Sequence, residues 1–187
     1  IDGTCNFVHG VPVVAVCIGC AVNKELELGI IYSPDDCKLY TGRKGHGAFC
    51  NGQRLWASRQ TDISKALIVT EIGSNRDPVA VKQLFTNLQR LLKLQAQGIL
   101  GSAALDLCHV AVGDVDAFYQ FGLHCWDIAA AAVIVREAGG IVMDTSGGPL
   151  DLMSRRVIAA GTSEMAQGLA RELQPIVYQR DDVSETG

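Results

Sequence analysis

The chain has 187 residues, enough to bury one good-sized core or two small ones. Hydrophobic residues make up 48% and charged residues 19%, which is a globular composition and excludes disordered and fibrous classes. The net charge of −4 implies no basic face for nucleic acid. No signal peptide is visible, and the longest apolar run, 11–22, is too short to span a bilayer.

The seven cysteines lie mostly in apolar runs, as Cys17, Cys20 and Cys108 do. This odd number and this placement predict buried, unpaired thiols in a reducing compartment. Cys17 and Cys20 have CxxC spacing, which occurs in redox and zinc sites. Because no second pair accompanies them in their apolar strand, we expect core positions with neither a disulfide nor a metal.

The first third of the chain predicts a short helical turn followed by strands. The run 11–22 is too apolar to alternate, which predicts a strand covered on both faces. The helical turn is expected at 2–8 and further strands at 26–32, 38–42 and 48–50, the last followed by an Asn51-Gly52 hairpin turn. Short turns between these strands predict an antiparallel meander.

After residue 62, helical and extended patterns alternate, which is typical of an α/β layer. Helices are expected at 78–94, at 103–112 with Ser102 as its cap, at 128–138 stopped by Gly139-Gly140, and at 163–173 capped by Thr162 or Ser163. Strands are expected at 66–70, 99–100, 115–121, 141–144 and 157–160. The predicted fold is therefore a mixed α/β (α+β) one: an antiparallel region over 1–62, an α/β sandwich over 63–178 and a loose polar tail over 179–187.

Two stretches carry groups that suit a cation and a phosphate. The turn Asp2-Gly3-Thr4 offers a carboxylate, a permissive backbone and a hydroxyl, and a turn that opens a helix points N–H groups outward. Asp127 stands just before the apolar run 128–135, where a helix begins. Taken singly, the first is an ordinary Asp-Gly turn and the second an ordinary N-cap.

Together, these stretches resemble the inositol monophosphatase family. That family carries Asp-Pro-(Ile/Leu)-Asp-Gly-Thr early, and Trp-Asp-x-Ala-x-Ala with a later Glu-Ala-Gly-Gly. The matching residues here are Ile1 to Thr4, then Trp126-Asp127-Ile128-Ala129-Ala130-Ala131 and Glu137-Ala138-Gly139-Gly140, with 45–52 between them. The likeness extends to about Asp182, and within the family the sequence is most similar to the second animal branch.

The resemblance implies a Mg²⁺-dependent phosphomonoesterase that hydrolyses inositol monophosphate through a metal-activated water. It assigns the metal to Asp2, Asp127 and the carbonyl of Ile1, and the phosphate to the amides of Gly3 and Thr4. Thr4 also orients the attacking water, so that Asp2, Thr4 and Asp127 form the catalytic set. It assigns the binding of the inositol to Gly101, Ser102, Ala103 and Gln120, and less specifically to Ser74. Family members are typically cytoplasmic, lithium-inhibited homodimers, so no nucleic-acid or membrane partner is expected.

Two departures from the family pattern bear on the site. The family places an Arg three residues before the Gly that matches Gly101, whereas this chain has Gly98 there and is about two residues shorter. Gln120 replaces a Glu of the best-studied branch; it keeps hydrogen bonding but brings no charge, which favours a shifted substrate preference. Arg155, Arg156 and Arg180 read as isolated surface charges, and Glu71 and Asp106 lie in segments with no reason to face Asp2.

The resemblance also implies a missing N-terminal part, including helices that would cover one face of the first sheet and the first Asp of the Asp-Pro pair. We therefore expect an exposed apolar face on that sheet. Three alternatives stay open: a catalytically impaired fragment, a non-catalytic partner subunit, and a phosphatase of another sugar phosphate.

Overall fold

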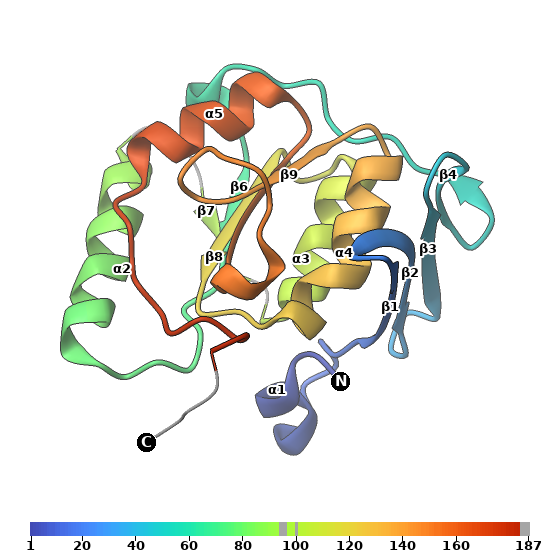
Figure 1. Ribbon diagram of the computed structural model, residues 1–187, viewed down its shortest axis with the longest axis horizontal. Coiled ribbons are helices and arrows are strands. Elements are labelled where there is room, and N and C mark those ends of the chain that lie inside the picture. Colours follow the sequence, from blue (N-terminus) through green and yellow to red (C-terminus); the bar gives the residue numbers. More distant parts are fainter. Residues whose placement is uncertain (94–96, 100, 184–187) are drawn as a thin grey trace.

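The computed structural model describes residues 1–93, 97–99 and 101–183, and within them the chain folds into four layers (Figure 1). A first sheet packs on helices α3 and α4, these pack on a second sheet, and α2 and α5 cover the far side of that sheet. This is the mixed α/β architecture that the sequence predicts. No described helix is long and apolar enough to cross a membrane.

The first sheet is the predicted antiparallel meander, in the order β1-β2-β3-β4-β5. Its strands are β1 (Val16–Val22), β2 (Glu25–Ser33), β3 (Lys38–Arg43), β4 (Gly47–Cys50) and β5 (Gln53–Arg54), and α1 (Thr4–His9) precedes it. The turn between β4 and β5 places Asn51 and Gly52 in left-handed conformations (φ 48° and 80°), as a tight two-residue hairpin requires.

The second sheet is mixed, in the order β7-β6-β8-β10-β9, with β6 parallel to both neighbours. Its strands are β6 (Ile68–Thr70), β7 (Gln97–Gly98), β8 (Ala117–Phe121), β9 (Ile141–Met143) and β10 (Arg156–Ala160). Its helices are α2 (Pro78–Leu92), α3 (Ala103–Val112), α4 (Cys125–Glu137) and α5 (Ser163–Glu172). Two 3₁₀ turns, Ile63–Lys65 and Leu152–Ser154, complete the described elements. The strand expected at 99–100 starts earlier, at Gln97; residues 94 and 100 lie outside the described part.

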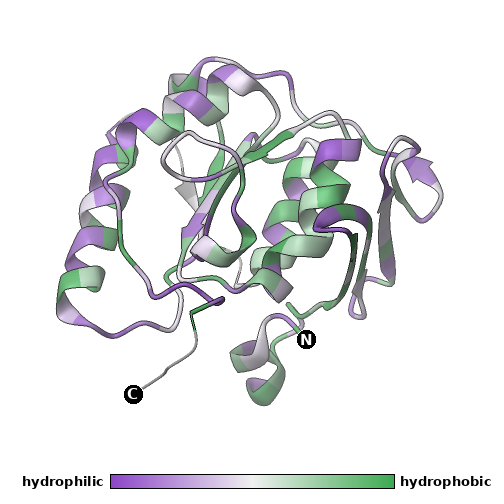
Figure 2. Ribbon diagram, in the orientation of Figure 1, coloured by the Kyte–Doolittle hydropathy of each residue, from purple (hydrophilic) through white to green (hydrophobic). Residues whose placement is uncertain are grey.

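Two apolar clusters form on the two faces of the second sheet. Strand β10 alternates between them: Val157 and Ala159 face α3 and α4, whereas Ile158 and Ala160 face α5. Figure 2 shows the corresponding hydropathy, with α3 and α4 mostly hydrophobic and α2 and α5 striped. The helices between the sheets are apolar almost all round because protein covers both of their sides.

A row of glycines crosses the first sheet beneath α4. Gly19, Gly29 and Gly42 are paired in register on β1, β2 and β3. A Cβ on Gly42 would lie 2.8 Å from the Cα of Ile134, and one on Gly19 would lie 3.0 Å from the Cβ of Ala129. The missing side chains let the helix backbone sit directly on the sheet, which fixes the height and direction of α4.

The opposite face of the first sheet is exposed, so β1 is not covered on both faces as its composition predicts. The side chains of Val16 and Ile18 are 43% and 55% exposed, and Cys20 is exposed beside them. On β2 and β3 the neighbouring Tyr32 and Leu39 are exposed too. An apolar face on this sheet was expected, and the structure shows it.

Candidate active site

Asp2 is held by both its backbone and its side chain. Its N–H and C=O pair with Ala15 just before β1, at 2.8 and 3.0 Å. Its Oδ2 accepts from the hydroxyl of Ser102 at 2.5 Å and from the N–H of Ala104 at 2.9 Å. Ser102 also caps α3 through Leu105, as predicted. The Asp2 carboxylate therefore lies at the start of α3, next to two of the predicted inositol-binding residues, Ser102 and Ala103.

The Asp-Gly-Thr turn requires its glycine. Gly3 has φ 78°, and a Cβ there would lie 2.5 Å from the carbonyl oxygen of Val13. Helix α1 starts at Thr4, so the first amides of the helix have no partner within it. Thr4 itself is exposed and available to solvent.

Asp127 is the third residue of α4 and not its N-cap, which corrects the sequence prediction. The N-cap is His124, whose backbone N–H donates to Asp127 Oδ2 at 2.9 Å. The helix thus begins three residues earlier than its apolar run suggests. Asp127 closes a capping box, an arrangement that fixes its side chain against the start of the helix.

Burial raises the pKa of the Asp127 carboxyl, and the negative charge of Asp2 raises it further, whereas the hydrogen bond from His124 lowers it. The Asp127 carboxyl therefore lies within electrostatic reach of Asp2, although 124 other residues separate them in the sequence. In the described part, each uses Oδ2 for its hydrogen bonds. Their Oδ1 atoms accept none there, which leaves one oxygen of each carboxylate for another partner.

The Gly101 turn is held by Glu71 and Asn6, neither of which the sequence predicts as a partner of Gly101. The N–H of Gly101 donates to Glu71 Oε1 at 2.5 Å, and its carbonyl accepts from the amide of Asn6 at 2.9 Å. Asp106, fully buried, stands beside Glu71 and within electrostatic reach of Asp2, contrary to expectation. Burial and the negative charge of Glu71 raise the pKa of Asp106 to about 9.

Gln120 is buried on β8, and its Oε1 has no hydrogen-bond partner among the described residues. Nearby, a hollow of about 240 Å³ is lined by Ser74, Gly122, Arg155 and Tyr178. Ser74 thus faces a cavity, as the family resemblance suggests. An unpartnered buried amide oxygen is the kind of group that a bound hydroxyl satisfies.

The three arginines predicted as isolated surface charges are all paired. The Nε atom of Arg155 lies 3.6 Å from Oδ1 of Asp181, and that of Arg156 lies 2.9 Å from Oδ2 of Asp144. The Nε atom of Arg180 lies 2.8 Å from Oδ1 of Asp182. The tail was expected to be loose from Gln179, yet Arg180 and Asp181 are hydrogen-bonded to the body of the chain. The partners of Arg155 and Arg156 are distant in sequence and leave no local signal, whereas Asp182 lies only two positions from Arg180.

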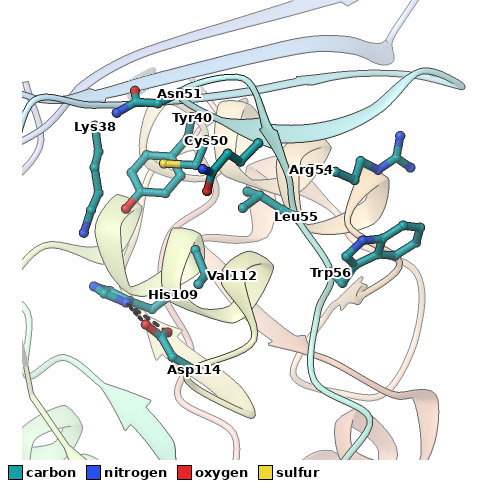
Figure 3. A pocket seen from close by; sticks show the side chains of 11 residues that line it. Lys38, Tyr40, Cys50, Asn51, Arg54, Leu55, Trp56, His109, Val112 and Asp114 are labelled. Carbon is teal, nitrogen blue, oxygen red and sulfur yellow. Dashed lines mark hydrogen bonds and ion pairs between the residues drawn. The ribbon is translucent and has the colours of Figure 1, made fainter.

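A separate hollow of about 520 Å³ lies between β3, β5 and the end of α3 (Figure 3). Lys38, Tyr40, Arg54, Trp56 and the ion pair His109–Asp114 are among its lining residues. None of the predicted site residues lines it. It is therefore not the candidate active site.

All seven cysteines are unpaired, as predicted for Cys17 and Cys20. Cys17 is half-buried, but Cys20 is exposed, so the expected burial is wrong for Cys20 because its face of β1 is uncovered. Among the described residues, no three His, Cys, Asp or Glu side chains are grouped as a metal centre. The pair of Asp2 and Asp127 is smaller than such a group of three.

The layered fold with helix-start carboxylates is that of the inositol monophosphatases. The structure of inositol monophosphatase from Anabaena (Nostoc) sp. PCC 7120 superposes with a TM-score of 0.87 at 34% identity, covering 91% of this chain and 69% of that one. The model described as "Inositol monophosphatase family" matches residues 1–178, and the chain belongs to that family.

The sequence is 63% identical to human inositol monophosphatase 2 over 97% of this chain, and 55% identical to human inositol monophosphatase 1 over the same share. This difference confirms the predicted similarity to the second animal branch. The chain spans 64% of the length of the first of these relatives and 66% of the second.

Proposed function

We propose that this chain forms part of a Mg²⁺-dependent phosphomonoesterase that hydrolyses inositol monophosphate to inositol and phosphate. The observation that carries the proposal is that Asp2 and Asp127 each stand at the start of a helix, with Asp127 close enough for the charge of Asp2 to raise its pKa. A similar fold, SaIMPase-II (TM-score 0.79, 25% identical), has been crystallised with inositol monophosphate bound.

The residues present suit a hard cation. Asp2 and Asp127 offer oxygen donors, each with Oδ1 not used in a described hydrogen bond, and the carbonyl of Ile1 is a third donor. A cation beside Asp127 would offset the burial and repulsion that raise its pKa. When bound, Mg²⁺ supplies Lewis acidity and a water of lowered pKa. These three residues would hold it.

The remaining roles fall to the chain's own turns. The amides of Gly3 and Thr4 bind phosphate oxygens, and the Thr4 hydroxyl orients the water that attacks phosphorus in line with the leaving oxygen. The start of α3 at Gly101, Ser102 and Ala103 faces the inositol hydroxyls. The side-chain amide of Gln120 forms a hydrogen bond with a hydroxyl of the inositol ring. Its Oε1, which has no partner among the described residues, supports this role.

The proposal extends to the finer properties of the family. The assembly is a homodimer, located in the cytoplasm and inhibited by lithium. Another sugar phosphate or a nucleotide is the alternative substrate, because SaIMPase-II has also been crystallised with 2′-AMP. A catalytically impaired or non-catalytic partner chain is the other alternative, because the described residues include no group of three or more His, Cys, Asp or Glu side chains that could hold a metal ion.

The test is phosphate release from inositol 1-phosphate at millimolar Mg²⁺, with 2′-AMP as the competing substrate. It is run on this chain and on a longer form with the family's Asp-Pro segment before Ile1. We expect the longer form to be active and this chain to be slow or inactive. Asp127→Asn in the longer form should abolish turnover, and the exposed Asp35→Asn should not. An inactive longer form, or one active only on 2′-AMP, refutes the proposal.

A further inference from the structure

The C-terminal segment contacts the start of α4 through one buried carboxylate. Asp181 has a side chain only 11% exposed. Its Oδ1 lies 2.8 Å from Nδ1 of His124, and its Oδ2 accepts from the N–H of Cys125 at 3.2 Å. Its own N–H donates to the carbonyl of Met153 at 3.1 Å. Asp181 is therefore fixed by its backbone while its side chain holds two consecutive residues of another element.

His124 is held at both nitrogens of its ring. Its Nε2 lies 3.2 Å from Nη2 of Arg155, a group that can only donate, so Nε2 accepts and the proton is on Nδ1, pointing at Asp181. Arg155 is itself fixed by donating to the carbonyls of Gly122 and Leu123 at 3.2 and 3.1 Å. The imidazole thus has a single orientation between the two charged groups.

The backbone of His124 is hydrogen-bonded to Asp127 in both directions. The His124 N–H donates to Asp127 Oδ2 at 2.9 Å, and the Asp127 N–H donates to the His124 carbonyl at 3.0 Å. A shift of the His124 backbone would therefore disturb the hydrogen bond that holds the Asp127 carboxylate. Asp181 is thus linked to Asp127 through its hydrogen bond with the His124 ring and the hydrogen bond from the His124 backbone to Asp127.

We propose that Asp181 is a positioning residue for Asp127: it fixes His124 and the first amide of α4, and so sets where the Asp127 carboxylate points. The link to metal binding rests on the proposed function. The structural part does not, because it concerns hydrogen bonds within this chain.

The neighbouring Asp182 provides a matched control. It is 48% exposed and pairs with Arg180, which also pairs with Asp151. A substitution at 182 disturbs the same segment and removes the same charge, but it touches neither His124 nor Cys125. A role in merely anchoring the tail would make the variants at 181 and 182 alike.

Amide hydrogen exchange tests whether Asp181 fixes the start of α4. In Asp181→Ala we expect the amides of His124, Cys125 and Asp127 to exchange about tenfold faster or more, because charge-assisted hydrogen bonds are lost. The amides in the last turn of α4 should keep their rates. Asp182→Ala should leave all of them unchanged. If Asp181→Ala fails to fold, Asp181→Asn, which keeps one acceptor oxygen, is used and should show a smaller acceleration at the same amides.

Calorimetric titration with Mg²⁺ alone reads the functional part. We expect the affinity for Mg²⁺ to fall in Asp181→Ala and to stay at the wild-type value in Asp182→Ala. Equal exchange in wild type and Asp181→Ala, or equal effects at 181 and 182, overturns the proposal. An unchanged Mg²⁺ affinity despite faster exchange overturns the role toward Asp127. If the longer form with the Asp-Pro segment, without a substitution, binds no Mg²⁺, the proposed function fails, and hydrogen exchange still decides whether Asp181 fixes α4.

Discussion

Gly29 of β2 touches the backbone of Ala130 in α4 so closely that a Cβ on Gly29 would overlap the carbonyl oxygen of Ala130. This contact lies in the middle of the glycine row under the helix. One turn further toward its start, the same helix carries Asp127. The position of a candidate site residue thus depends on the absence of side chains in a sheet.

The first prediction tests this contact. Gly29→Ala should lower the free energy of unfolding by about 1–3 kcal/mol or more, because α4 cannot move away without losing its contacts on both sheets. Gly168→Ala is the control: it lies in α5, where a Cβ would meet only Ile63, at 4.0 Å. That change should stabilise by about 0.5–1 kcal/mol. Urea unfolding measures both, and equal stability of Gly29→Ala and wild type would contradict the packing argument.

The second prediction joins two of the family motifs. Glu137 of the Glu-Ala-Gly-Gly segment accepts from the N–H of Gly45 at 2.8 Å and from that of Gly47 at 2.6 Å. In Glu137→Gln, the amide NH₂ must face one of these N–H groups, so we expect a loss of about 1–3 kcal/mol. Glu164→Gln, at an exposed position in α5, should be neutral in the same thermal unfolding experiment. A neutral Glu137→Gln would show that the turn between β3 and β4 holds without it.

The third prediction concerns the pH dependence of stability. The pKa of Asp106 rises from 3.8 to about 9 on folding, so the folded chain keeps a proton that the unfolded chain loses. The stability due to this proton is complete below pH 3.8 and is lost as the pH rises through about 9. Asp106→Asn should therefore be more stable than wild type at pH 8, by about 1 kcal/mol or more, and the difference should shrink toward pH 4.

Urea unfolding of wild type and Asp106→Asn from pH 4 to 8.5 measures this difference. The exposed Asp35→Asn serves as the control and should follow the wild-type curve. A variant less stable than wild type at pH 8 would mean that Asp106 is ionised and usefully paired in the folded chain.

The fourth prediction concerns the thiols. Cys5, Cys20 and Cys37 are exposed, whereas Cys108 is buried. Burial raises the pKa of Cys17 to about 12 and raises that of Cys108 well above its usual value, which lowers the thiolate fraction. Under native conditions a maleimide should modify the three exposed thiols first and Cys108 only on unfolding. Peptide mass spectrometry over time identifies them, and early modification of Cys108 would contradict the packing of α3.

Local signals predicted the helices well. The bounds of α3 follow from its apolar run and from Ser102, whose cap is confirmed. The start of α4 was placed three residues late because Asp127 is a common N-cap residue, whereas His124 is not. Propensity favours the common cap, and only the hydrogen bond from the His124 N–H shows that Asp127 is the third residue of the helix.

The contacts that assemble the candidate site could not be predicted, because they join distant positions. Glu71 reaches Gly101 from 30 residues away, and Asn6 reaches it from 95 away. No periodicity or turn residue marks such pairs. For Cys20 the composition of its strand indicated burial, but burial depends on what covers the sheet and not on the strand alone.

The hydrogen bonds of Asp2 and Asp181 can form only late during synthesis, because each joins residues that are far apart in the sequence. Asp2 bonds to a residue 100 positions later, and His124 waits for a partner 57 positions later. On the ribosome, α4 emerges well before Asp181, and its first turn lacks that carboxylate until then. The Asp127 end of the site is therefore completed by a residue that is synthesised 57 positions after His124. Ribosome-bound chains stopped before position 181 should fold their layers without a fixed start of α4.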